Sequence, residues 1–522
     1  LADASIVTLA LPPIIAELDA SVEQAAAVLG VYTLVLALAL PVAARVRHGA
    51  LAAGGMALFA AASLGCGLAQ SIEALLVLRG VQAVGGAALL VGAFPLLDAG
   101  GSGRRAWTAT AIFGFAAGPA LGGALTQAFD WRAIFLVQAP IAAAAAIAAW
   151  RMARNDRITG RKAPPTIEPA PFDARAATAL ALVSAALVGV LFLLVLLLVT
   201  GWSTSPLAAA AAVTVLPIAA VAASRIRGPA RTRAAAGALL LAGGILALAS
   251  LPGANLLWTV VPQLMAGAGL GLALPALAGG LLPEDTPEQA ASLLSLRHAG
   301  ITVALIVLAP VAAAQLDDAV ADTRIQGTAL VLDARLPPLE KLSLAGTLIG
   351  DIDPVDPRGE LQASLDRART GDPEFDVLAE RADETLVAGV QEAFAPALAI
   401  CGALALLAAL VLLPWDRRVL AAAAAAAVLA GGARLALPGL EPEPVRIADP
   451  CDPRDLPDTG GIDGAIQDAA LAALDRAACE FGSSREELAL ALVDEDARTD
   501  YEREYGVDPR SASGLLGALL GR

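Results

Sequence analysis

The sequence predicts an all-α polytopic membrane protein with two six-helix halves, a thirteenth span and small helical additions outside the membrane. Hydrophobic residues make up 57% of the 522 residues, and the mean hydropathy is +0.69, whereas soluble domains contain about 45–50% apolar residues. Aromatic residues are only 4%, so the apolar excess consists of Ala, Leu, Val and Gly, which suits helices that pack closely in lipid. Windows of about 20 apolar residues recur along the chain, as membrane-spanning helices require.

Twelve apolar windows divide into an N-terminal half, residues 1–150, and a C-terminal half, residues 177–414, joined by a polar cytoplasmic linker, 151–176. The windows lie near 1–16, 25–44, 50–68, 74–97, 106–126 and 133–150, and near 177–200, 206–223, 234–251, 257–282, 299–315 and 393–414. No cleavable signal peptide is visible. The chain opens inside an apolar run, so we expect the first helix to begin upstream of Leu1.

The distribution of basic residues predicts the orientation, because Lys and Arg are retained on the cytoplasmic side. With a cytoplasmic N-terminus, the cytoplasmic connections hold 17 basic residues, and the short outer connections hold one, Arg132. We therefore expect a multi-pass protein of the cell membrane. A thirteenth span within 415–438 would carry the C-terminal tail outside. Its core, 419–437, is Ala-rich and includes Arg434, so an interfacial helix with a cytoplasmic tail is the alternative.

Two acidic additions account for the net charge of −15. The insertion 316–388 holds 16 acidic and 7 basic residues, the tail 439–522 holds 19 and 8, and the remainder is weakly basic. Neither addition is basic enough to bind nucleic acid. We expect both to be extracytoplasmic and to be where a partner molecule would bind.

Each addition shows helical patterns. The stretches 360–370 and 374–392 of the insertion read as amphipathic helices. Nearby, Asp351, Asp353 and Asp356 could bind calcium through carboxylate oxygens, but a solvated turn is the favoured interpretation.

The sequence of the tail predicts a small helical hairpin, with helices at 463–481 and 484–504. Ser484 with Glu487 forms a capping-box pattern. Cys451 and Cys479 bracket the first of these helices, and an extracytoplasmic location would permit a disulfide between them.

Four segments resemble signatures of one transporter family. They are the first helix with Asp3 and Pro12-Pro13; the fourth-helix motif Leu78-Arg79-Gly80-Val81-Gln82-Ala83-Val84-Gly85-Gly86-Ala87; the fifth-helix motif Gly118-Pro119-Ala-Leu-Gly122-Gly123, followed by Asp130-Trp131-Arg132; and the helix 7–8 connection Gly201-Trp202-Ser203-Thr204-Ser205-Pro206-Leu207. Together they resemble the major facilitator superfamily, in its multidrug:proton antiporter branch, best known for fourteen-span drug exporters. The resemblance covers about residues 1–315 and part of 393–414.

The chain departs from that family in two respects. The loop between helices 2 and 3, Ala44 to Gly49, lacks the acidic residue of the family's pattern, as does its counterpart from Ser224 to Arg233. The central pair of linker helices is absent, which leaves twelve core spans plus one. The resemblance implies the major facilitator fold and a secondary transporter rather than an enzyme, with the proton gradient as its energy source and without a cofactor.

Asp3 and Arg79 are the candidate proton-coupling residues. Asp3 lies about 13 residues before the outer end of its helix, which is about 20 Å of depth at about 1.5 Å per residue. Charged groups at such depth persist where they face a cavity or a partner. The alternative for Asp3 is a helix-entry residue near the cytoplasmic interface. Arg79 matches the family's buried Arg, for which a purely structural role is an equal alternative.

Other polar and small residues complete the candidate site. Thr8 and Gln82 are near these charges in register and are candidate cavity-lining groups. Gly118, Pro119, Gly122 and Gly123 match the antiporter hinge, although ordinary close packing would also use such glycines. Two His and four scattered Cys make no metal site, and the absence of a phosphate-binding loop argues against an ATP-driven pump.

These observations favour proton-driven export of amphipathic or cationic small molecules by alternating access. Two alternatives remain open from the sequence. One is the export of a lipid or cell-envelope component, with the insertion steering the hydrophobic cargo onward. The other is a membrane sensor or scaffold that transports nothing, which the degenerate loops favour and the intact fourth- and fifth-helix motifs oppose.

Overall fold

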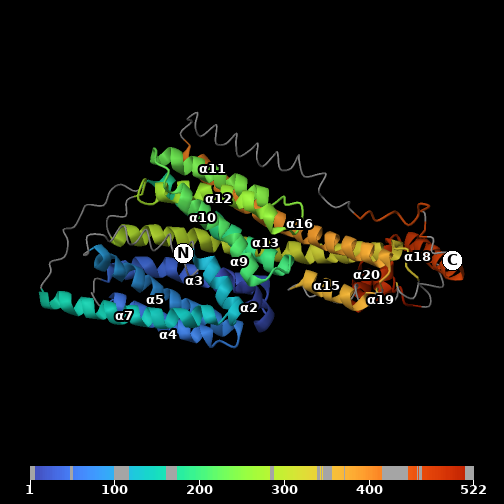
Figure 1. The fold of residues 1–522 in the computed structure, drawn as a ribbon, viewed down its shortest axis with the longest axis horizontal. Coiled ribbons are helices and arrows are strands. Elements are labelled where there is room, and N and C mark those ends of the chain that lie inside the picture. The colour runs from blue at the N-terminus through green and yellow to red at the C-terminus, as the bar shows by residue number, and fades with distance from the viewer. Residues whose placement is uncertain are drawn as a thin grey trace.

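Every named element of this computed structural model is a helix (Figure 1). The structure describes residues 6–46, 51–98, 117–159, 173–282, 287–337, 341, 344, 356–369, 371–413, 445–454, 456–457 and 461–511. Nine of the described helices are long and apolar enough to cross a membrane, which confirms the all-α polytopic class. The predicted thirteenth span, 419–437, lies outside the described residues, as does the start of the predicted fifth span.

The N-terminal half contains α2 (Leu11–Leu18), α3 (Val22–Arg45), α4 (Leu51–Gly67), α5 (Ile72–Asp98), a helix at 117–128 and α7 (Ala133–Thr159). Local signals begin these helices. Ser21 and Gln24 form a capping box at the start of α3, in which each side chain accepts the other residue's backbone N–H. The Asp130 carboxylate accepts the backbone N–H of Arg132 and of Ala133 where α7 begins.

Small residues let the membrane helices touch backbone to backbone. A Cβ placed on Gly85 of α5 would lie 2.6 Å from the Phe59 nitrogen of α4, and one on Gly55 would lie 2.5 Å from the Leu89 nitrogen. A larger residue at either position would force the two helices apart. The Ala- and Gly-rich composition therefore serves close helix packing, as expected in lipid.

The C-terminal half contains α8 (Ala174–Leu196), η1 (Leu197–Gly201), α9 (Pro206–Val213), α10 (Val215–Ala223), α11 (Ala230–Leu248), α12 (Leu256–Leu277), α13 (Pro287–Asp333) and α16 (Pro373–Leu412). α8 continues directly into η1, a single π-helical turn. α9 and α10 occupy the predicted eighth span and are separated at Thr214, whose hydroxyl donates to the Ala210 carbonyl.

The acidic insertion grows out of two long membrane helices rather than beginning where they end. α13 has 47 residues and α16 has 40. They are antiparallel, since Gly389 of α16 lies against Thr323 of α13, and farther along Gly189 of α8 lies between Leu308 and Cys401. The eleventh apolar window ends near 315, but α13 continues for about 27 Å beyond it at about 1.5 Å per residue. Hydropathy marks where the lipid ends, not where the helix ends.

Between these two helices the insertion contains α15 (Pro357–Ala368), close to the predicted helix at 360–370. The Asp356 carboxylate caps α15 by accepting the Gly359 N–H at 3.1 Å. The predicted helix at 374–392 is the first half of α16, continuous with the twelfth span.

The tail folds into α18 (Gly461–Phe481), α19 (Arg485–Val493) and α20 (Glu495–Tyr505). The Ser484–Glu487 capping box forms at the start of α19. The second predicted tail helix is interrupted at Asp494, whose side chain accepts the Ala497 N–H and so begins α20.

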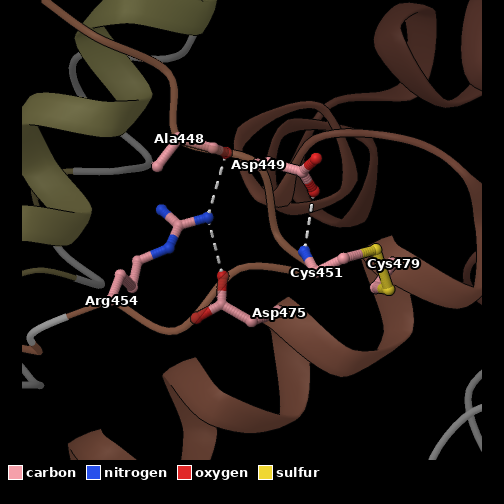
Figure 2. The surroundings of a disulfide bond; sticks show 6 residues. All are labelled: Ala448, Asp449, Cys451, Arg454, Asp475 and Cys479. Atoms are coloured by element: carbon pink, nitrogen blue, oxygen red, sulfur yellow. Dashed lines mark hydrogen bonds and ion pairs between the residues drawn. A yellow bond between two sulfur atoms is a disulfide. The ribbon is translucent and has the colours of Figure 1, made fainter.

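A disulfide joins Cys451 to Cys479 and holds the segment before α18 against that helix (Figure 2). On the same segment, Arg454 pairs with Asp475 of α18 at 2.9 Å and donates to the Ala448 carbonyl.

The tail docks on the extended end of α13. Arg485 of α19 pairs with Asp333 at 2.7 Å, and Asp494 lies 3.6 Å from Arg324. Figure 1 shows the tail helices grouped beside the far ends of α13 and α16. The insertion and the tail therefore lie at the same end of the molecule.

Candidate transport pathway

Among the residues that the structure describes, two helix pairs provide close contacts between the halves. In the first, α3 packs on α13, where the hydroxyls of Thr33 and Thr302 are 2.9 Å apart and buried, and Ser295 donates to the Ala37 carbonyl at 2.5 Å. The sequence does not predict these contacts. Their signal is weak, because a Ser or Thr within an apolar helix commonly satisfies its hydroxyl on its own backbone.

The second pair joins the 117–128 helix to α9 and includes the predicted hinge motif. A Cβ on Gly123 would lie 2.6 Å from the Pro206 carbonyl oxygen, and one on Gly122 would lie 2.6 Å from the Ile6 carbonyl oxygen. Gln127 adds a hydrogen bond to the Leu207 N–H at 3.1 Å. The motif glycines are thus the positions at which the helix touches both helix 1 and the opposite half.

A small cavity lies beside this contact, between the two halves. It is lined by Thr8, Leu9, Pro119, Leu191, Val195 and Val213. Thr8 and Pro119 were predicted site residues, and both are buried. Gly118 is also buried, one position from the cavity wall. The other five lining residues are apolar, and two of them, Leu191 and Val195, belong to α8. The space is about 10 Å³, which has room for about one water molecule.

Arg79 is fully buried within the N-terminal half and is not among the residues that line the cavity. Its Nε donates to the Val28 carbonyl at 3.1 Å, and its Nη1 donates to Gln82 Oε1 at 2.6 Å. The guanidinium lies over the Tyr32 ring at 4.2 Å and near the Phe135 ring at 5.6 Å. A planar cation suits such stacking and directional donation, which an ammonium reproduces poorly.

Gln82 relays the position of Arg79 to two further helices. Its amide nitrogen donates to Ser63 of α4 at 2.8 Å and lies 3.5 Å from Gln138 Oε1 of α7. Gln82 was predicted to line a cavity, and the structure places it in this network instead of among the residues that line the cavity between the halves. The network connects α3, α4, α5 and α7, so a movement of Arg79 would change contacts among all four helices.

Several predicted residues lie outside the described part of the chain. Asp3 is one of them, and Asp351 and Asp353 of the calcium hypothesis are two others. Asp356 is described, and its carboxylate serves α15 and Ser203. Among the residues that the structure describes, no group of three His, Cys, Asp or Glu could hold a metal ion.

These features define a multi-pass, all-helical membrane protein whose two halves enclose a small apolar cavity. A family model, the Major Facilitator Superfamily, matches residues 1–310. The chain belongs to the Major Facilitator Superfamily.

Similar proteins share shorter stretches. The chain is 41% identical over 96 residues to the multidrug resistance protein Stp of Mycobacterium tuberculosis, which covers 17% of this chain and 18% of that protein. It is 35% identical over 150 residues to the cephamycin export protein CmcT of Amycolatopsis lactamdurans, with coverage of 27% and 31%. The matches thus span about a fifth to a third of the relatives' length.

The fold has solved counterparts. The crystal structure of a bacterial homologue of the human lysosomal transporter Spinster, inward-facing and unoccupied, superposes with a TM-score of 0.53 at 16% sequence identity. The superposition covers 80% of this chain and 95% of the other. At this identity the likeness concerns the fold alone.

Proposed function

We propose that this chain is a proton-coupled secondary transporter that exports amphipathic or cationic small molecules by alternating access. The observation that carries the proposal is the close contact of Gly123 with α9 of the opposite half, beside a small apolar space that both halves line. Membership of the superfamily supports transport. The names of the similar proteins, which include multidrug resistance and antibiotic export, support the direction and the substrate class.

In this proposal the residues have separate tasks. Asp3 binds and releases the coupled proton. Arg79 tunes that step through the helices that its network connects. Gly118, Pro119, Gly122 and Gly123 form the hinge, in which Gly123 contacts the opposite half and Gly122 contacts the first helix, because glycines leave few side chains to interlock.

We further propose a cell-membrane location with the N-terminus in the cytoplasm and with the insertion and tail outside. The 17-to-1 distribution of basic residues supports this orientation. The contacts of Asp333 with the tail support a thirteenth crossing. α16 returns toward the opposite end of the bundle at Leu412, while the tail, described from Val445, pairs with α13 near Asp333.

The test is proton release from acidified proteoliposomes that contain the full-length protein, on addition of a panel of lipophilic cations. We expect substrate-triggered proton movement that disappears in Asp3→Asn. The matched control is Asp19→Asn, an exposed residue at the end of α2, which should behave as the unmodified protein. No proton movement with any cation, in protein shown to be folded, would contradict the proposal.

Export of a lipid or envelope component is the second candidate. It is favoured by the lining of the cavity, in which Thr8 alone among the described residues is polar. A helical assembly at the insertion end could also receive a hydrophobic cargo. Loss of an envelope lipid from a deletion strain, restored by the full-length gene, would favour this candidate over drug export.

A further inference from the structure

The end of α8 nearest the insertion combines several costly local features. η1 (Leu197–Gly201) is a π-helix, a rare form that often marks a functional position. Ser203 has a φ of 53°, in the left-handed region that residues with a Cβ seldom adopt. The Trp202 Nε1–H is buried without a hydrogen-bond partner in the described part of the chain. Such features persist only where surrounding contacts hold them in place.

Two residues at the start of α15 make those contacts. Arg358 donates from Nη1 to the Trp202 carbonyl at 3.2 Å. The Asp356 carboxylate accepts a short hydrogen bond from the Ser203 hydroxyl. Two successive residues after η1, Trp202 and Ser203, are therefore hydrogen-bonded to the start of α15, which lies more than 150 positions later in the chain.

Arg358 is in turn fixed to α16. Its Nε and Nη2 donate to the two oxygens of Asp383 at 2.8 and 2.7 Å. Both side chains are mostly buried, with 20% and 25% of their surface exposed. Parallel bonds of this kind add geometric specificity to the charge attraction. One guanidinium thus joins the end of α8 to the extension of the twelfth span.

The segment that Arg358 and Asp356 hold continues the helix that lines the cavity between the halves. Leu191 and Val195 of α8 line that cavity, and η1 continues the same helix. Val195 and Trp202 are seven residues apart, about 10 Å along a helix. A movement of α8 away from the cavity would therefore displace the segment that Arg358 and Asp356 hold.

We propose that Arg358, Asp356 and Asp383 form a clamp that keeps the end of α8 closed over the cavity, and that the clamp must release before the cavity opens toward the insertion. Arg358 is a positioning residue in this proposal, since it acts through the backbone of Trp202. The insertion then regulates access to the pathway. The inference rests on the proposed alternating access, and its test requires no substrate and no proton gradient.

The test measures access to Val195→Cys, introduced into a chain in which the buried Cys66 and Cys401 are replaced by Ala. A charged, membrane-impermeant thiosulfonate is added to sealed vesicles of both orientations. We expect Arg358→Ala to raise the labelling rate at least tenfold, only from the side on which the insertion lies. Ala363→Cys, exposed on α15, identifies that side by its rapid labelling.

The matched control is Arg369→Ala, which removes an insertion ion pair that is largely exposed, with Asp376 at 3.2 Å, and should leave the rate unchanged. Asp383→Asn preserves shape and removes charge, and serves if Arg358→Ala fails to fold. Combined with Arg358→Ala, it should add little further increase. An unchanged rate in folded Arg358→Ala or Asp383→Asn, or an equal rise in Arg369→Ala, overturns the clamp. Loss of proton release with an intact clamp response would instead count against the proposed function alone.

Discussion

Two fully buried arginines, Arg79 in the membrane body and Arg485 in the tail, differ in the contacts that the structure describes. The contacts described above for Arg79 are a carbonyl oxygen, an amide oxygen and two aromatic rings. Arg485 donates to two carboxylates, Asp333 at 2.7 Å and Glu486 at 2.8 Å. Asp475 lies a little farther away, at 3.9 Å.

The difference reflects the surroundings of each group. Asp333 is 55% exposed, so the ion pair of Arg485 borders on water, as in a soluble protein. Carboxylates are costly at membrane depth, and the described contacts of Arg79 include a neutral side chain, Gln82, that itself bridges helices. We infer that Arg485 serves docking and Arg79 serves the geometry of the bundle, and the following predictions test that division.

The largest expected effect is that of Arg79→Lys on proton-coupled transport. An ammonium cannot reproduce both hydrogen bonds and the stacking on Tyr32. A hydrogen bond of a charged group contributes about 1.5–3 kcal/mol, so we expect a loss of about 100-fold or more in the proteoliposome assay. Arg485→Lys should leave transport within about twofold. Normal transport by folded Arg79→Lys would assign this residue a structural role only.

Arg485→Ala should release the tail from α13. Removing one member of a buried ion pair costs about 3–5 kcal/mol, and the exposure of Asp333 places the effect toward the lower end. Hydrogen exchange of α19 in the full-length protein should become much faster, while that of α5 stays slow. Arg503→Ala, which removes an exposed pair with Asp500, is the control. Unchanged protection of α19 would show that docking does not depend on Arg485.

Removing the disulfide should weaken the same docking less strongly. Cross-links of this kind contribute about 2–4 kcal/mol, here by holding Arg454 beside Asp475 and Glu486. The double change Cys451→Ser and Cys479→Ser should lower the thermal midpoint of the tail and leave Arg79-dependent transport unchanged. Differential scanning calorimetry with and without reductant checks this. A loss of transport as large as that in Arg79→Lys would contradict the separation between the tail and the membrane body.

The smallest expected effect is a pH dependence of the stability of the region around the docking site. Burial lowers the pKa of Lys341 to about 8, and its Nζ donates to the Leu332 carbonyl beside the docking site. The folded protein then binds fewer protons than the unfolded chain above about pH 8, so stability should rise with pH there, by at most about 1.4 kcal/mol per pH unit.

Thermal midpoints between pH 7 and 9 measure this effect below the range in which Tyr501 titrates, since burial raises its pKa. The rise should disappear in Lys341→Met. A midpoint that falls with pH in the unmodified protein would contradict the assignment.

Much of this protein is determined by its sequence because the signals are local. Apolar windows set the membrane spans, the basic residues predict the orientation, and Ser484 with Glu487 marks the start of a helix. Cys451 and Cys479 are joined in the structure as their positions around one helix indicated. The family motifs around Arg79 and Gly118 to Gly123 led to the superfamily to which the chain belongs.

The tertiary structure decided what depends on distant partners. Hydropathy could not reveal that α13 continues from lipid into the insertion, because helix hydrogen bonds form equally well in both surroundings. Nor could it pair Arg358 with Trp202 or Arg485 with Asp333, which are more than 150 residues apart. The residues next to a charged side chain in the sequence do not indicate its partner. Only the packing of the long helices brings these groups within hydrogen-bond distance.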